Sequence, residues 1–201
     1  MSSTPFGRTR WRRFATVMAG GLIATTGLVL LTGQGVLAVS FSISGMPFTV
    51  TSPKLHGYGF AQYAEIDNMA PGSPNGEANG EQVLVIVSAI RDAELDGLCQ
   101  SIDLGGTHLR LTAGSATNKV KADTLVVDSD MISANADFKK IDIAKDASTL
   151  TQVPGRTGGI GVFGQEAEEV TLTNLRQNNW ATTAVRFYLP NLSMSFSSNG
   201  C

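Results

Sequence analysis

The chain has 201 residues and a formal net charge of -2, and 42% of its residues are hydrophobic while 16% are charged. This composition excludes an intrinsically disordered chain, and the charge balance gives nucleic acid no general electrostatic reason to bind. Two cysteines are too few for a disulfide-dense scaffold. The length fits one domain with a substantial core, with or without a targeting segment.

The N-terminal segment joins four arginines to a long uncharged stretch that begins at Phe14. A basic head before an apolar run is typical of a secretory signal peptide, with cleavage after Ala38. The run also reaches the short end of the length that spans a bilayer, so a retained anchor is the alternative. We expect a signal peptide or membrane anchor over residues 1–38. Residues 39–201 are expected to form a single β-rich exported domain, either extracellular or on the outer face of the cytoplasmic membrane.

The first strand pattern follows directly. Residues 39–44 alternate apolar side chains with serines, and a period of two indicates a half-buried strand. Gly45 and Pro47 interrupt the alternation, which resumes at Phe48 with the opposite parity. The interruption predicts a bulge or bend.

Strand patterns then recur to the end of the chain. The run Val83–Val87 predicts a strand buried on both faces. Residues 134–148 fit a helix and a strand followed by a turn equally well. Further short alternating or apolar segments lie at 109–111, 125–127, 141–143, 170–173, 185–189 and 192–197. We expect an all-β fold, a curved sandwich, roll or solenoid-like stack of short strands after an N-terminal hydrophobic helix.

Loops are expected where glycine, proline and asparagine cluster. The sequence places them at 68–80, 105–106, 114–118 and 154–164.

The two cysteines are far apart in the sequence. Export would place Cys99 and Cys201 in an oxidising compartment, where a disulfide between them is the simplest state. Two unpaired thiols and an intermolecular bond are the alternatives.

No motif in the chain indicates an enzyme. A G-x-S-x-G nucleophile elbow is absent, so we predict no catalytic residue, although His56 or His108 could approach a serine in some folds. Gly159, Gly161 and Gly164 match the spacing of the dinucleotide fingerprint but lack the strand before and the helix after that it needs. We therefore expect no cofactor.

Acidic residues offer a weak metal signal. Asp123, Asp128 and Asp130 could supply oxygen ligands to a hard cation. The spacing of an EF-hand loop is missing, and solvated carboxylates at strand edges and turns explain these residues more simply. No metal site is predicted.

The richest apolar stretch lies near the C-terminus. Core packing is the simpler expectation for it, and the alternative is a groove or cavity that holds an acyl chain. The predicted ligand-binding residues are Trp180, Phe187, Leu192, Met194 and Phe196.

Four blocks of the chain resemble a known family. They are SISGMPFTVTSPKLHGYGFAQY within Phe41–Tyr63, AELDGLCQSI at 93–102, ANADFKKIDIAKDAST at 134–149 and ATTAVRFYLPNLSMSFSSNGC at 181–201. These resemble small exported actinobacterial proteins of uncharacterised function, whose members are often labelled "cholesterol esterase" by name transfer. Lys145 stands where the family pattern has a glycine. The resemblance implies the same two cysteines and so favours their disulfide.

The sequence favours an exported, non-enzymatic protein of the cell envelope or medium. Its expected partner is a lipid-like apolar small molecule or an envelope protein, with membrane contact only through an uncleaved N-terminal segment and no nucleic acid. The alternatives are a lipid or cholesterol ester hydrolase, as the family label implies, and a structural surface subunit.

Overall fold

The computed structural model describes Trp11 and residues 42–76 and 82–201. The chain divides between Ala38 and Val39 into two units, and every described residue except Trp11 belongs to the second. The predicted signal peptide or anchor, with its hydrophobic helix, falls outside the described residues apart from Trp11. Among those described, no helix has the length and apolar character needed to cross a membrane.

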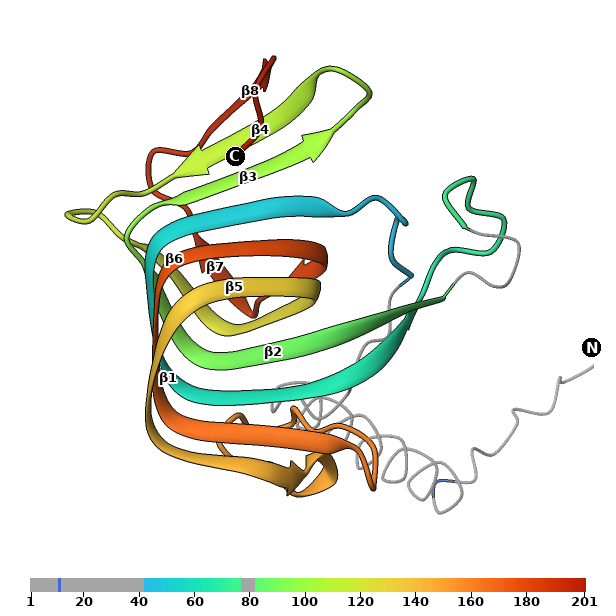
Figure 1. Ribbon diagram of the computed structural model, residues 1–201, viewed down its shortest axis with the longest axis vertical. Coiled ribbons are helices and arrows are strands. Elements are labelled where there is room, and N and C mark those ends of the chain that lie inside the picture. The colour runs from blue at the N-terminus through green and yellow to red at the C-terminus, as the bar shows by residue number, and fades with distance from the viewer. Residues whose placement is uncertain (1–10, 12–41, 77–81) are drawn as a thin grey trace, which may run out of the picture. The chain divides into compact units, whose positions relative to one another are not determined.

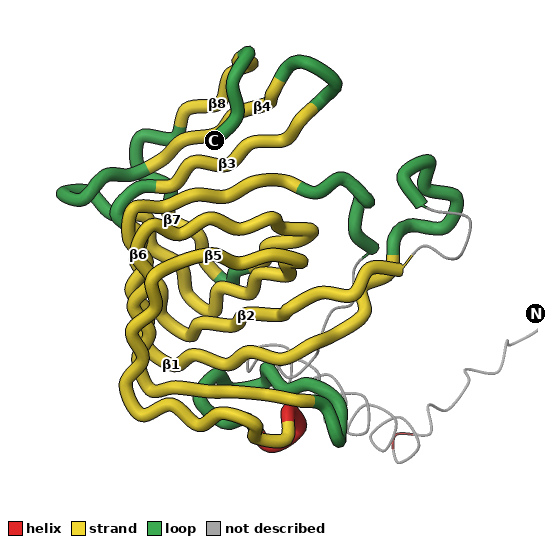
Figure 2. Tube along the Cα trace, viewed as in Figure 1, coloured by secondary structure: helices red, strands yellow, loops and turns green. Residues whose placement is uncertain are grey.

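The second unit is built from β-strands, which confirms the predicted all-β class (Figures 1 and 2). A short 3-10 turn, η1 (Ala147–Thr149), follows the longest strand. The strands are β1 (Phe48–Asn68), β2 (Gln82–Leu95), β3 (Leu98–Asp103), β4 (His108–Ala113), β5 (Val120–Asp146), β6 (Phe163–Thr183), β7 (Arg186–Tyr188) and β8 (Ser193–Ser197).

Two local expectations are settled by these bounds. The ambiguous stretch 134–148 is strand as far as Asp146 and then enters η1. The run Val83–Val87 lies in β2, but burial on both faces is wrong because Leu84 is 69% exposed. A run of apolar residues does not reveal whether both faces of its strand are covered by other elements.

Within the described residues the named strands pair antiparallel, and four of these strands form a closed ring. β1 pairs with β2, β2 with β5, β5 with β6, and β6 returns to β1. We call these four strands the ring. β3 pairs with Thr49–Thr51 near the start of β1, β4 and β8 extend the sheet beyond β3, and β7 pairs with β5. Closing the pairing removes free edges from the four longest strands.

The expectation of short strands holds for β3, β4, β7 and β8, which have 3 to 6 residues, but is wrong for the ring. β1 and β6 have 21 residues each and β5 has 27, several times the usual strand length. In Figure 1 these strands turn sharply instead of running straight. Pro53 and Gly59, which look like strand ends in the sequence, lie at bends in β1, and the pairing with β6 continues on both sides of each bend.

One bend crosses the whole ring along a single line. On one side of β1, Gly59 lies opposite Arg91 of β2, which lies opposite Thr124 of β5. On the other side, Gly59 lies opposite Glu168 of β6, which lies opposite Lys140, also of β5. Three of these positions have left-handed backbones, with φ of +67° at Gly59, +50° at Thr124 and +52° at Lys140. A left-handed residue inside a strand redirects the chain, so neighbouring strands turn together. A second bend passes Pro53 and Asn174, where φ is +54°.

The bends sort side chains between two cores. Phe60 and Ile90 belong to a cluster inside the ring, whereas their neighbours Ala61 and Ala89 face a second cluster outside it. The strand period of two separates these faces. The loop after η1 covers the outer cluster with Leu150 and Val153.

Two carboxylates hold this covering loop. Asp146 accepts hydrogen bonds from the backbone N–H groups of Ser148 and Gly161. The buried Glu166 accepts from the N–H groups of Thr151 and Gln152, at 2.6 and 3.0 Å, and pairs with Lys145. Burial opposes its charge, but these donors hold the pKa of Glu166 below its ordinary value.

The predicted disulfide between Cys99 and Cys201 is confirmed, with Cα atoms 5.9 Å apart. The C-terminus is also held by hydrogen bonds, because the Cys201 N–H donates to Ser101 Oγ and its carbonyl accepts from Arg176. Closing a loop between residues 102 positions apart restricts the unfolded chain, worth about 4–5 kcal/mol in the chain-entropy model.

The bend at Gly59 can be tested by adding one methyl group. A Cβ at Gly59 would lie 2.6 Å from the carbonyl oxygen of Gln152, in the loop that covers the sheet. We expect Gly59→Ala to lower the free energy of unfolding by about 3 kcal/mol, from the left-handed backbone and the collision together.

Gly105→Ala is the matched control, because Gly105 has a φ of +83° but open space around it. Its expected cost is about 1 kcal/mol, from backbone strain alone. Urea unfolding measures both, and equal losses would contradict the collision at the bend.

Candidate ligand-binding site

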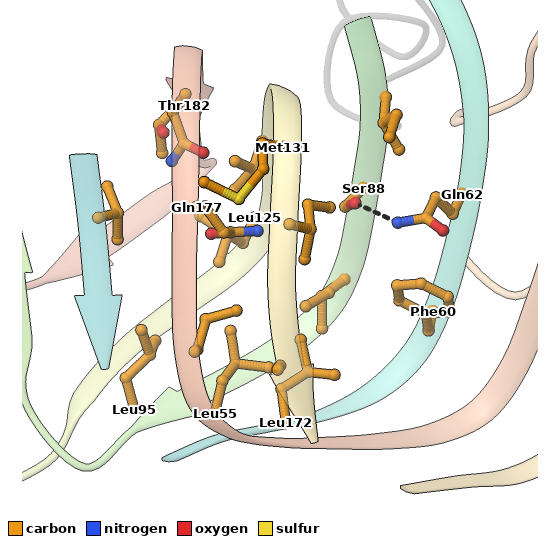
Figure 3. A pocket seen from close by; sticks show the side chains of 18 of the residues that line it. Leu55, Phe60, Gln62, Ser88, Leu95, Leu125, Met131, Leu172, Gln177 and Thr182 are labelled. Atoms are coloured by element: carbon orange, nitrogen blue, oxygen red, sulfur yellow. Dashed lines mark hydrogen bonds between the residues drawn. The ribbon is translucent and has the colours of Figure 1, made fainter. Parts of the chain in front are cut away.

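A cavity of about 520 Å³ lies within the ring (Figure 3). Its volume falls in the range of pockets that hold small organic molecules. Its lining comes from the four ring strands together with β3 and β7. The lining residues are Val50, Leu55, Phe60, Gln62, Ile86, Ser88, Ile90, Leu95, Leu98, Gln100, Leu125, Val127, Asp130, Met131, Ile132, Ala134, Ala136, Phe138, Leu172, Leu175, Gln177, Asn179, Thr182 and Phe187.

The cavity is apolar along the part of the ring that lies between the two bends. Leu55 and Leu172 are paired neighbours on β1 and β6, and Leu55 also pairs with Leu95 on β2. All three are at least nine-tenths buried. In Figure 3 they lie together at one end of the cavity, away from the labelled polar side chains. We call this part the leucine end.

Polar side chains line the other part of the cavity. Gln62 donates from Nε2 to Ser88 Oγ at 2.8 Å and accepts from Gln165 Nε2 at 2.5 Å. Gln177 and Asn179 lie on β6 beyond the second bend and are 6% and 1% exposed. Asn179 Oδ1 is buried without a hydrogen-bond partner. We call this part the amide end.

The cavity is open to solvent near the amide end, where Ile86 and Met131 are exposed, and the lining is exposed at Ala136 and Phe187 as well. Ile86, at 37% exposed, is two residues from Ser88, and Met131, at 42% exposed, pairs with Asn178. Asp130 also lies here, and it is held by Asn178 Nδ2 at 2.8 Å and by Trp180 Nε1 at 2.9 Å.

The five predicted ligand-binding residues lie in different places. Phe187, on β7, lines the cavity. Trp180 does not, but its indole holds Asp130 at the opening. Leu192, Met194 and Phe196 lie just before and on β8, where they are 51%, 60% and 73% exposed.

The expectation that this stretch packs in the core is therefore wrong for the last three residues. β8 is the last strand of the sheet and pairs on one side with β4. Alternation in the sequence identifies a shared face but not whether another element covers that face.

Sequence reasoning missed the leucine end and the amide end. One signal was present, since Gln62, Ser88 and Gln177 occupy positions that share a face with core residues of the same strands. That face can be recognised only if the bend positions are known, because even-numbered and odd-numbered residues exchange the inward and outward faces of a strand at each bend.

The two histidines make no hydrogen bond to a serine within the described part of the chain. His56 Nδ1 lies 3.1 Å from Thr171 Oγ1, and its Nε2 lies 3.5 Å from Glu169 Oε1. His56 lies between Leu55 and Gly57, so strand alternation directs it away from the cavity. His108 Nδ1 is buried without a partner.

The glycine motif and the aspartates form no ligand site in the residues described. Gly164 lies in strand β6, directly after the loop that holds Gly159 and Gly161, so the helix of a dinucleotide fold does not follow. No three His, Cys, Asp or Glu side chains in residues 42–76 and 82–201 are arranged to hold a metal ion.

Asp128 lies on the outer face of the ring, next to Val127 of the cavity lining. Burial, together with the charges of Asp67 and Glu65, raises its pKa to about 7, and Arg156 partly offsets this. Burial also raises the pKa of both Asp67 and Glu65. This group of carboxyls therefore resists ionisation.

Comparison with known proteins gives a family and nothing more specific. A family model described as a family of unknown function, DUF6230, matches residues 44–201. Neither a curated protein nor a solved structure matches the chain.

The outer carboxyl group predicts a pH-dependent stability. The pKa of Asp128 is about 7 in the folded chain against an ordinary 3.8, so the unfolded state loses its proton first. The free energy of unfolding should fall as the pH rises from about 4 to about 7. Asp128→Asn should match the wild type near pH 4 and exceed it in stability at pH 8, measured by urea unfolding.

Asp137→Asn serves as the control, because it removes the same charge from an exposed position on the same strand. It should follow the wild type across this pH range. An Asp128→Asn curve parallel to that of the wild type would exclude Asp128 as the source of the pH dependence.

Proposed function

Because the chain belongs to DUF6230, a family of unknown function, we propose from its own geometry that it binds a lipid-like apolar molecule in the ring cavity and is not an enzyme. The observation that carries this proposal is a 520 Å³ cavity with a leucine end, enclosed by paired strands. The walls of this open cavity would present apolar surface to water, and covering apolar surface is favourable. An apolar occupant therefore explains a cavity with this lining.

The chemistry of the leucine end supports an acyl-like occupant. Leu55, Leu95 and Leu172 offer carbon surface and no hydrogen-bonding side-chain atom. Each methylene buried against such surface contributes about 0.8 kcal/mol. A flexible chain of methylenes gains affinity along its length, whereas a polar molecule would lose its hydration there.

The geometry favours binding over ester hydrolysis. Ser88 and Thr182 are the hydroxyl side chains of the lining, and no histidine or lysine lies among the lining residues. A nucleophilic hydroxyl needs a base within hydrogen-bond reach. Ser88 Oγ instead accepts from Gln62 Nε2, and an amide nitrogen is no base.

The proposed setting is outside the cytoplasm, either secreted or on the outer face of the membrane. The basic and apolar pattern of residues 1–38 and the disulfide between Cys99 and Cys201 support it. Disulfides of this kind persist in oxidising compartments.

Filling the cavity tests the proposed function. Ala134 lines the cavity, and Ala134→Phe would place a ring inside it. We expect the purified protein to bind the neutral apolar fluorophore N-phenyl-1-naphthylamine, and this variant to bind it at least about tenfold more weakly because the volume is taken.

Ala116→Phe is the matched control, because Ala116 is exposed in the turn before β5. It should bind the fluorophore as the wild type does, and circular dichroism should show all three proteins folded. Undiminished binding by folded Ala134→Phe would place the fluorophore elsewhere, and no binding by the wild type would refute the proposal.

A further inference from the structure

Asn179 has an unmet need for a hydrogen bond. Its side chain is 1% exposed, lines the cavity and has a buried Oδ1 without a partner. The residue opposite it on β5, Ser129, uses its hydroxyl to donate to the Ile86 carbonyl. Folded proteins rarely leave a buried amide oxygen unpaired. Exchanging the amide oxygen and nitrogen of Asn179 would leave a donor unpaired instead.

Gln177 adds a second amide on the same face. It lies two residues before Asn179, is 6% exposed, and has no side-chain hydrogen bond to any residue that the structure describes. Val50 pairs with Gln177 on one side and with Gln100 on the other, and all three line the cavity. The amide end thus holds two amides whose hydrogen-bonding capacity the described residues do not meet in full.

The charge of the lining limits what can bind there. Its described residues include no lysine, arginine or histidine, and Asp130 is the one carboxylate among them. An anionic head group would lose hydration without gaining a counter-ion, and Asp130 in the lining would repel it. Asp130 is already held by Asn178 and Trp180 in the exposed opening, so it is a weak partner for a buried cation.

We propose that the ligand is a neutral amphiphile. This inference rests on the proposed function. The apolar chain of the ligand would lie in the leucine end, and its hydroxyl or amide head would bind Asn179 and Gln177. An uncharged head that both donates and accepts satisfies the two amides, whereas a fatty-acid carboxylate does not.

Three competitors with the same twelve-carbon chain test the head group. We would measure displacement of N-phenyl-1-naphthylamine from the purified protein at pH 8 by dodecan-1-ol, kept below its solubility limit, and by dodecanoate and dodecylammonium, kept below the concentrations at which they form micelles. We expect dodecan-1-ol to bind at least about tenfold more tightly than either charged competitor, because each of these must bury its charge without a partner.

Variants of the amide end test the assigned residues. Asn179→Leu keeps the size of the side chain and removes its amide, so its affinity for dodecan-1-ol, taken relative to its affinity for the fluorophore, should fall about five- to tenfold. Gln177→Met is the second variant if Asn179→Leu does not fold. Asn135→Leu, on the outward parity of β5, is the control and should change neither affinity.

The outcomes separate the two proposals. A wild type that does not bind the fluorophore refutes the proposed function itself. Fluorophore binding with dodecanoate or dodecylammonium equal to or better than dodecan-1-ol refutes the neutral head group and leaves the cavity as a binding site. A preference for the alcohol that persists in both folded amide variants refutes the assignment to Asn179 and Gln177.

Discussion

The fold depends on a backbone constraint shared by adjacent strands. Gly59, Thr124 and Lys140 all have left-handed backbones on one line across the ring. Because neighbouring strands turn at matching positions, their hydrogen bonding continues on both sides of the bend. A bend in one strand alone would break its pairing and leave backbone groups unsatisfied. The common bend lets long strands close into a ring without losing their partners.

Closing the ring creates an interior that the side chains do not fill. The leucine end is formed by the short stretch between the bends, where β1 pairs in register with β2 and β6. Beyond the second bend, the inward positions carry Gln177 and Asn179. Buried amides without partners weaken a fold. Their place beside the cavity therefore favours a role in binding over a role in stability.

The outside of the ring is secured by different chemistry. Glu166, paired with Lys145 and two backbone donors, holds the covering loop over the outer apolar cluster. The disulfide fixes the C-terminus to β3. Glu166 is thus satisfied by backbone donors and Lys145, and Asp130 is the one carboxylate among the described lining residues of the cavity. This lining gives the cavity its selectivity for uncharged ligands in our proposal.

The sequence by itself determined the all-β class and the loops at 105–106, 114–118 and most of 154–164, and it made a disulfide between Cys99 and Cys201 the simplest state, because alternation, turn residues and cysteine number are local or compositional signals. It could not separate a bend from a strand end, since Pro53 and Gly59 fit both. The sequence also predicted Trp180, Phe187, Leu192, Met194 and Phe196 as ligand-binding residues. Of these five, only Phe187 lines the cavity. Tertiary structure alone decided which faces meet, because inward parity changes at each bend and depends on strands distant in the sequence.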